Sequence, residues 1–287
     1  MTQQSDLASA FRALHLPGTP LVLPNAWDAV SARVVEDAGA GAVATTSAGL
    51  VWALGAPDGE RAGRDAVVAA VARIADAVTV PVTADIEGGY AEDAEGVAGT
   101  VRAFLAAGAV GVNIEDTLHD AGPRGPLRDV AEQAERIAAA REAADAAGVP
   151  LFVNARIDTY LGGAGGVDLT LERAAAFRAA GADGIFVPGA AGADGIFVPG
   201  AVDPGTLKEL VEGVDGPLNV MAGPGAPSVA ELAALGVARI SVGSGIAQAA
   251  HALVRRAARE LLDRGTYGAL TDALGYGEVN ALLDRAR

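Results

Sequence analysis

The sequence contains no cysteine and almost no lysine, and each absence removes a class of protein. With no Cys among its 287 residues, the chain has no disulfide framework, no thiolate nucleophile and no metal site built on sulfur ligands. Lys208 is the one lysine among 21 basic residues, and its surroundings are typical of a solvated helix face rather than of Schiff-base chemistry. No GxSxG elbow and no strand followed by GxGxxG occurs, so serine hydrolases and dinucleotide-binding folds have little support.

Positive charge is also scarce. The 36 acidic residues against 21 basic ones give a formal net charge of −15, which repels nucleic-acid phosphates and anionic lipid surfaces. The N-terminus lacks the basic start and apolar core of a secretory signal, and the long apolar segment 179–202 is too rich in Gly and Pro for a membrane helix. We therefore expect a cytoplasmic protein with neither nucleic-acid nor membrane partners.

Short apolar runs that end in small or polar residues alternate with Ala-rich amphipathic stretches along most of the chain. Such alternation predicts parallel strands joined by crossover helices, and several of the helical stretches end in Gly, as helices commonly do. The strand candidates are 21–24, 42–46, 80–85, 110–115, 151–156, 184–188, 217–222 and 239–243. Eight such units in one chain predict an α/β fold, a single (β/α)₈ TIM-type barrel domain over residues 1–287.

Residues 246–287 read as a C-terminal helical extension, because two further helical patterns follow the eighth strand. The first covers 246–265 and the second 272–286. Extra helices with apolar faces usually pack on the barrel or on another subunit. We expect a homodimer or homotetramer that assembles through these helices.

An 11-residue tandem duplication interrupts the pattern at the sixth strand. The segment AGADGIFVPGA occupies 180–190 and recurs without change at 191–201, although a barrel has one slot for it. Either copy can fill the slot. We favour the second, because that choice keeps the connection into the next helix short at the catalytic face and sends the extra residues to the opposite face.

Polar side chains gather where the predicted strands end, which is where (β/α)₈ enzymes build their sites. The third strand ends in Asp85 and Glu87, and the fourth in Glu115. Three carboxylates at neighbouring strand ends repel one another, and a hard cation such as Mg²⁺ relieves that repulsion. The alternative is that these carboxylates cap helices or pair with Arg. We expect Asp116 to cap a helix or pair with Arg in this way, because successive side chains of a strand point to opposite faces and Asp116 directly follows Glu115.

Other strand ends offer groups for an anionic ligand. Arg156 would present a bidentate fork to a carboxylate or phosphonate, unless it forms a buried pair with Glu115. At a tight turn, Ser47, Ala48 and Gly49 would offer backbone N–H groups to an anionic oxygen. The three histidines are scattered along the chain, so a histidine metal triad is not expected. His119, in a loop of Gly, Pro and Arg, is either a site acid or a solvated loop residue, and we favour the second.

These motifs resemble, in order, those of the isocitrate lyase and phosphoenolpyruvate mutase superfamily over roughly residues 20–250. The resemblance implies a Mg²⁺-dependent enzyme that makes or breaks a C–C or P–C bond beside a 2-oxo acid, through a pyruvate enolate. The motifs are PNAWDAVSARVVEDAG (24–39), TTSAGL (45–50), LGAPDGE (54–60), TADIEGGY (83–90), VNIEDT (112–117) and VNARIDTY (153–160).

Carried over residue by residue, the resemblance assigns roles to this chain. Asp85, Glu87 and Glu115 would surround Mg²⁺, with Glu115 also catalytic. The substrate carboxylate would bind at Ser47, Ala48 and Gly49. Arg156 would stabilise the enolate or leaving group, and Asp58 would lie at the gate of the site. The remaining pocket residues would be Trp27, Asn154 and Asn219.

Two departures from the family bear on the reaction. Glu87 stands where many members carry Asp, and the loop 118–129 has neither the lyase branch's Lys-Arg-Cys-Gly-His run nor the mutase branch's Lys and Asn. The substitutes that we consider in that loop are Arg124 and His119. We expect a Mg²⁺-dependent lyase or decarboxylase for a small 2-oxo or 2-hydroxy dicarboxylate. The alternatives are a phosphoenolpyruvate or phosphonopyruvate mutase or hydrolase, and a barrel that only binds pyruvate-like ligands.

Overall fold

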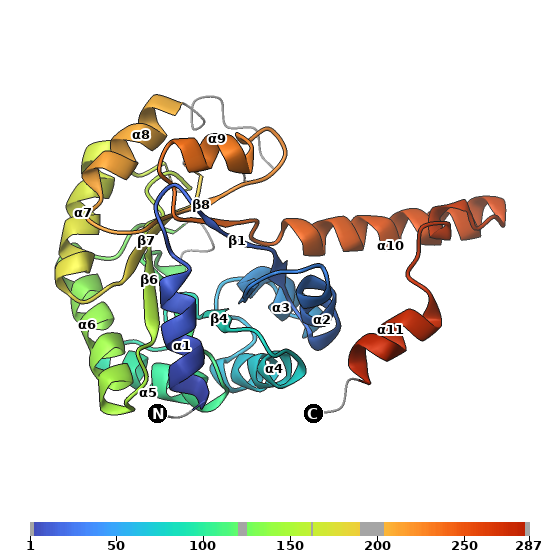
Figure 1. The fold of residues 1–287 in the computed structure, drawn as a ribbon, viewed down its shortest axis with the longest axis horizontal. Helices are drawn as coiled ribbons and strands as arrows, with labels where there is room; N and C mark the ends of the chain where they lie inside the picture. The colour runs from blue at the N-terminus through green and yellow to red at the C-terminus, as the bar shows by residue number, and fades with distance from the viewer. Residues whose placement is uncertain (1–2, 120–124, 162, 190–203, 285–287) are drawn as a thin grey trace.

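Parallel strands and helices alternate along the chain as the apolar runs predict (Figure 1). The computed structural model describes residues 3–119, 125–161, 163–189 and 204–284. The strands are β1 (Leu21–Leu23), β2 (Asn25–Ala26), β3 (Val43–Thr45), β4 (Val82–Asp85), β5 (Gly111–Glu115), β6 (Phe152–Arg156), β7 (Gly184–Val187), β8 (Leu218–Met221) and β9 (Arg239–Ser241).

These nine strands occupy eight positions in the barrel wall. β1 pairs with β9 and β2 pairs with β3, all in parallel, and only Pro24 separates β1 from β2. The expected first strand, 21–24, is therefore split, because proline has no N–H to donate to a sheet ladder. Since the two pieces are consecutive in the chain, they close the sheet into the predicted α/β barrel.

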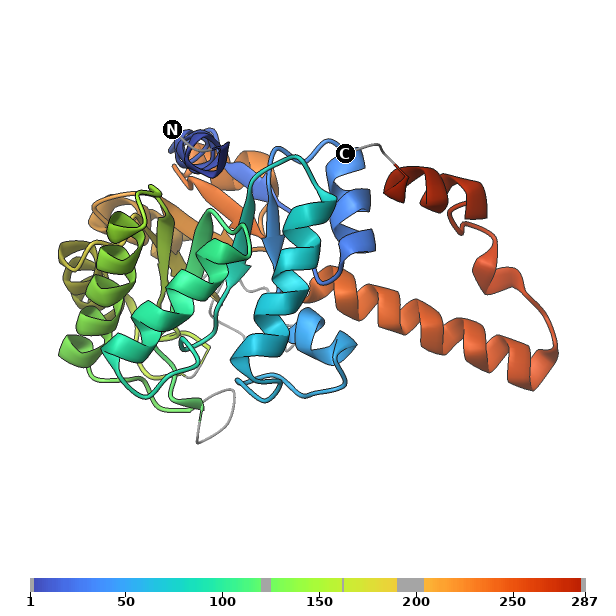
Figure 2. The ribbon, with the colours of Figure 1, turned by 90° about the horizontal axis from the view of Figure 1, so that it is seen from below.

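Helices form the outer layer (Figures 1 and 2). Several begin at a side chain that accepts a backbone N–H in the first turn, as Asp93 does from Gly96 and Ser228 from Glu231. The helices are α1 (Gln3–Ala13), α2 (Ala29–Asp37), α3 (Ser47–Ala53), α4 (Arg64–Ala77), α5 (Ala94–Ala106), α6 (Val130–Ala146), α7 (Val167–Ala179), α8 (Pro204–Gly213), α9 (Val229–Ala234), α10 (Gly245–Arg264), the 3₁₀ turn η2 (Gly268–Leu270) and α11 (Tyr276–Leu283).

Helix α1 closes the end of the barrel where the strands begin. Its Phe11 ring meets the rings of His15 and Phe152 edge-on, and His15 stacks on Phe152 with centroids 3.9 Å apart. All three side chains are buried. The barrel is thus plugged by aromatic packing at one end, which leaves the carboxyl ends of the strands as the open end.

The first copy of the duplication, not the second, forms the sixth barrel strand. β7 pairs with β6 and β8, and it belongs to the copy 180–190. Our expectation was wrong: the first copy follows α7 directly and fills the slot. Its Asp183, just before β7, forms ion pairs with Arg12 and Arg141 at the closed end, at 2.5 and 3.0 Å. These contacts tie the start of β7 to α1 and α6. The second copy, 191–201, lies outside the described residues.

The C-terminal helices leave the barrel. α10 projects outward, and α11 returns toward α2 (Figure 2), where the buried Arg33 donates a hydrogen bond to the carbonyl of Leu282 at 2.8 Å. None of the helices in the described part of the chain is both long and apolar enough to span a membrane.

Candidate active site

One polar cavity of about 190 Å³ lies at the carboxyl ends of the strands. It receives residues from nearly every strand end, as expected for this architecture. Its wall comprises Asn25, Thr46, Ser47, Ala48, Asp58, Asp85, Asn113, Arg156, Leu161, Phe186, Met221, Ser241, Gly243 and Ser244. Five of the residues singled out from the sequence are therefore together in this wall: Ser47, Ala48, Asp58, Asp85 and Arg156.

The turn from β3 into α3 supplies the anion-facing groups. Thr46 caps α3 by accepting the N–H of Gly49, so this N–H is already used. A side chain at Gly49 would meet Thr46 and Trp27 at 2.7 and 3.1 Å, which explains the glycine by close packing. The N–H groups of Ser47 and Ala48 have no recorded acceptor within the described residues and begin a helix that lines the cavity.

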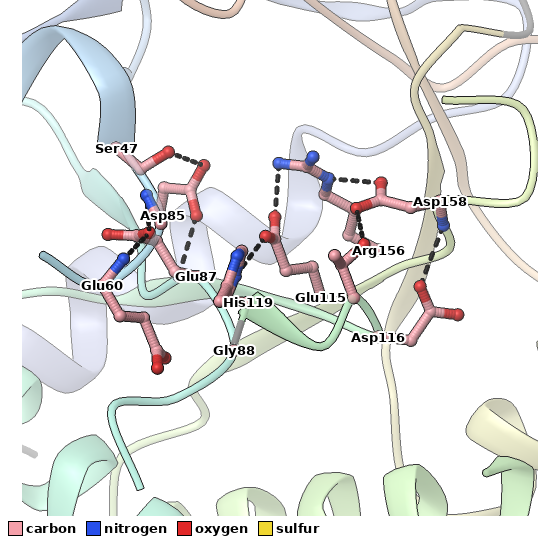
Figure 3. A network of polar contacts seen from close by, with 12 residues as sticks. Ser47, Glu60, Asp85, Glu87, Gly88, Glu115, Asp116, His119, Arg156 and Asp158 are labelled. Atoms are coloured by element: carbon pink, nitrogen blue, oxygen red, sulfur yellow. Dashed lines mark hydrogen bonds and ion pairs between the residues drawn. The ribbon is translucent and has the colours of Figure 1, made fainter. Parts of the chain in front are cut away.

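Asp85 faces the cavity from the end of β4 (Figure 3). Its carboxylate accepts the hydroxyl of Ser47 at 3.3 Å and the backbone N–H of Glu87 at 3.0 Å. Its own N–H donates to Thr45 in β3. The side chain is therefore oriented by both neighbouring segments.

Glu87 turns away from Asp85. Its backbone has a φ of 49°, in the left-handed region that non-glycine residues seldom occupy. Its carboxylate accepts the N–H groups of Gly59 and Glu60 at 2.9 and 2.5 Å and the hydroxyl of Tyr90 at 2.5 Å. Glu87 thereby ties the loop that carries Asp58 to the loop that follows β4.

Glu115, at the end of β5, lies between two cationic groups (Figure 3). One oxygen is 2.7 Å from Nε2 of His119, and the other is 2.5 Å from Nη1 of Arg156. Arg156 also donates Nε to Asp158 at 2.6 Å. The buried pair considered from the sequence therefore exists, while Arg156 still lines the cavity and its Nη2 has no recorded partner within the described residues.

Two expectations about neighbouring residues have different outcomes. His119 is not a solvated loop residue, because its side chain is only 10% exposed and pairs with Glu115. Its position four residues after Glu115 was the signal that could have shown this. Asp116 does turn away from the cavity, as expected, and pairs with the buried Arg173 at 2.7 Å. Arg124 lies outside the described residues.

Burial dominates the acid–base behaviour of the carboxylates. Burial raises the pKa of Asp85, and nearby Asp58 raises it further. The same cause raises the pKa of Asp58, with Glu87 adding to it. Burial also raises the pKa of Glu115, to about 7, against the attraction of Arg156. These clustered carboxyl groups destabilise one another's charged forms.

The carboxylates at the cavity are suitable ligands for a hard divalent cation, although they are not arranged around a common point in this structure. Among the residues that the structure describes, no three His, Asp or Glu side chains converge as metal ligands. However, Asp58 has a buried carboxylate oxygen, Oδ1, with no hydrogen-bond partner in that same part of the chain. Desolvated, mutually repelling carboxylates of this kind are the oxygen ligands that Mg²⁺ prefers.

The other predicted pocket residues lie behind the cavity rather than in its wall. Asn154 and Asn219 are buried below it and bonded to each other at 3.1 Å. Trp27 packs against the core. Sequence reasoning did not assign seven wall residues to the site, although all of them except Leu161 lie in a strand or within three residues of its end: Asn25, Leu161, Phe186, Met221, Ser241, Gly243 and Ser244.

Comparison with known proteins agrees with the resemblance seen in the sequence. The family model for phosphoenolpyruvate phosphomutase matches residues 11–191 and 189–262. The break between the two matches falls at the junction of the duplicated segments. The 2,3-dimethylmalate lyase of Eubacterium barkeri is 32% identical over 222 residues, which are 74% of this chain and 74% of the relative.

Solved structures agree in fold over nearly the whole chain. A putative lyase/mutase from Burkholderia cenocepacia J2315 is 39% identical with a TM-score of 0.86, and the match covers 97% of this chain and 96% of that one. A phosphonopyruvate hydrolase solved with oxalate and Mg²⁺ is 26% identical with a TM-score of 0.81, covering 98% and 95%. With the fold, the strand-end motifs and the family match in agreement, this chain belongs to the isocitrate lyase and phosphoenolpyruvate mutase superfamily.

Proposed function

We propose that this protein is a Mg²⁺-dependent lyase or decarboxylase that acts on a small 2-oxo or 2-hydroxy dicarboxylate. The observation that carries the proposal is the composition of one cavity. Helix N–H groups at Ser47 and Ala48, the desolvated carboxylates Asp58 and Asp85, and the guanidinium of Arg156 all line it. Relatives with C–C lyase names, such as the dimethylmalate lyase, support the same reaction class.

Asp85 and Asp58 would hold the metal ion from the cavity wall, with Glu115 behind them. A bound Mg²⁺ would supply a Lewis acid that stabilises negative charge on a substrate oxygen. Glu115 already shares its two oxygens between His119 and Arg156, so it would contribute mainly through its charge. Glu87, with both oxygens bonded to other groups, would hold the Asp58 loop closed over the site.

The chain's own groups would bind and orient the substrate. The N–H groups of Ser47 and Ala48 would bind its carboxylate, because they begin a helix and need an acceptor. Breaking a bond beside the 2-oxo group develops negative charge on that oxygen. Arg156 would stabilise this charge with Nη2, while Glu115 and Asp158 hold the rest of its guanidinium in place.

The size of the cavity limits the substrate. About 190 Å³ is small beside the roughly 300–1,000 Å³ of pockets for drug-sized ligands. Phe186, Met221 and Leu161 form its apolar side. A short-chain acid fits this space, whereas a nucleotide or a sugar phosphate does not.

A substrate panel tests the proposal. Oxaloacetate, 2-methylisocitrate, 2,3-dimethylmalate and phosphonopyruvate are each incubated with the protein and Mg²⁺, and product is measured by nuclear magnetic resonance. We expect turnover of at least one dicarboxylate, and Asp85→Ala should lower its kcat/KM by at least about 100-fold.

The matched control is Asp65→Ala, which removes a carboxylate exposed on α4. This variant should keep the activity of the unaltered protein, and circular dichroism should show that both variants fold. Turnover of phosphonopyruvate alone would favour the mutase or hydrolase function instead. Activity that Asp85→Ala leaves unchanged would refute the metal-binding assignment.

A further inference from the structure

A cluster of four buried polar residues, here called the floor, lies against the cavity and contributes Asn113 to its wall: Asn113, Asn154, Asn219 and Arg239. Asn113 in β5 lines the cavity, and Asn154 in β6 stands beside it in register. The amide nitrogen of Asn154 donates to Oδ1 of Asn113 at 2.9 Å and to Oδ1 of Asn219 at 3.1 Å. Arg239, the first residue of β9, is the register partner of Asn219.

Arg239 is a buried cation with unused donors. It is 0% exposed, and its Nη2 donates to Oδ1 of Asn113 at 3.2 Å. Its Nε and Nη1 are buried without a hydrogen-bond partner within the described residues. Its guanidinium carbon also lies 5.9 Å from the centre of the Phe11 ring. A buried charge without a partner destabilises a folded protein strongly. A buried arginine at position 239 is therefore unfavourable for stability alone.

Arg239 determines which way the Asn113 amide points. A guanidinium donates hydrogen bonds and cannot accept them, so the Asn113 atom facing it must be the oxygen. The same oxygen also accepts from Asn154. The amide nitrogen of Asn113 is thereby turned away from the floor, and it has no recorded acceptor among the described residues. Because Asn113 lines the cavity, its N–H groups are available to a ligand there.

The electrostatic surroundings agree with an anionic ligand. Burial lowers the pKa of Arg239 to about 9, and the attraction of Asp85 opposes this, so the guanidinium stays charged at neutral pH. Asp85 is also the register partner of Asn113 across β4 and β5. A ligand oxygen near Asp85 would therefore lie near the Asn113 N–H groups, above the positive charge of Arg239.

We propose that Asn113 is a substrate-binding residue and Arg239 its positioning residue, and that together they select ligands with two carboxylate groups. This inference rests on the proposed function for the location of the ligand. Asn113 donates from the floor to a ligand oxygen. Arg239 holds that amide in the donating orientation and adds a buried positive charge, which favours a dianion over a monoanion.

The test compares the binding of oxalate, a dianion, with that of pyruvate, a monoanion. Each is titrated into the protein with and without Mg²⁺, and its affinity is measured by calorimetry. Asn113→Asp keeps the shape and the acceptor for Arg239 but replaces the cavity-facing N–H groups with an oxygen. We expect at least a 10-fold weaker oxalate affinity, with an unfolding temperature that is unchanged or higher because the new carboxylate pairs with Arg239.

Variants of Arg239 test the positioning role. Arg239→Met should weaken oxalate binding at least 10-fold and pyruvate binding less, and Arg239→Lys should recover part of the oxalate affinity. Arg33→Met is the matched control, since Arg33 is also a buried arginine but pairs with Glu36 and Leu282 away from the cavity. It should lower stability and leave oxalate affinity unchanged.

Each outcome separates this inference from the proposed function. Oxalate affinity that is equal in Asn113→Asp and the unaltered protein would overturn the inference even if the substrate panel shows turnover. Absence of oxalate binding to the unaltered protein would overturn it as well. Oxalate binding that depends on Asn113 and Arg239, without turnover of any panel substrate, would support the inference and count against the proposed enzyme activity.

Discussion

Two histidines show how the surroundings of a side chain decide its charge. His119 loses hydration on burial, which favours its neutral form, but its hydrogen bond to Glu115 and the nearby carboxylates raise its pKa to about 9. His15 is buried at the closed end of the barrel, where desolvation and the charge of Arg239 lower its pKa to about 3. The first is therefore a cation at neutral pH and the second a neutral aromatic ring.

We predict that His15 makes the protein less stable in acid. The unfolded chain binds a proton at His15 with a pKa near 6.5 and the folded protein only near 3. The unfolded state therefore holds more protons between these values, and stability falls as the pH drops through this window, by at most about 1.4 kcal/mol per pH unit. Urea unfolding of His15→Phe between pH 7 and pH 5 should show a smaller loss than the unaltered protein. Parallel losses in the two proteins would contradict the prediction.

At the scale of elements, strand β7 shows how two identical sequences become unequal. Copies 180–190 and 191–201 have the same propensities and the same apolar pattern, so nothing local distinguishes them. The first copy follows α7 directly, and its Asp183 reaches Arg12 and Arg141 at the closed end of the barrel. Position in the chain, directly after α7, therefore distinguishes the first copy from the second.

Equivalent substitutions in the two copies test this assignment. Ile185 is fully buried in β7, so Ile185→Ala should lower the free energy of unfolding by about 2–5 kcal/mol. Ile196→Ala, the same change in the copy that does not form β7, should lower it by less. Chemical denaturation of both variants gives the comparison. A larger loss from Ile196→Ala, or equal losses from the two, would refute the assignment.

At the scale of the whole molecule, α10 and the segment after it project from the barrel as an arm, whose last helix, α11, returns to α2 (Figures 1 and 2). Large apolar side chains are exposed along it, including Val254 at 65%, Leu262 at 83% and Tyr276 at 89%. Soluble monomers seldom expose so many large apolar groups together. The arm therefore favours the homodimer or homotetramer expected from residues 246–287.

We predict that this arm mediates assembly. Light scattering after size-exclusion chromatography should give a dimer or a tetramer, because association would bury the exposed apolar side chains. Val254→Asp with Leu262→Asp should shift the protein toward monomer while circular dichroism stays unchanged. A protein that is monomeric before substitution, or an assembly unaffected by it, would contradict the prediction.

The parts of the site that could be predicted from the sequence lie where a strand ends in a polar residue. Ser47, Asp85 and Arg156 could be placed because parallel strands bring their carboxyl ends to one end of a barrel. Side-chain direction could not be read in the same way. Glu87 turns toward the loop at Gly59 because of its left-handed backbone, and a one-dimensional pattern carries no signal for that.

Local patterns in the chain were enough for the barrel, its eight strand positions and the family, since each depends on apolar periodicity and on motifs a few residues long. Only the tertiary structure decided three other features: the cavity floor, which of the identical copies forms β7, and the pairing of His119 with Glu115. Arg239 and Asn113 are 126 residues apart, and the Asn113 amide acquires its direction only when closure of the barrel places a donor-only guanidinium beside it.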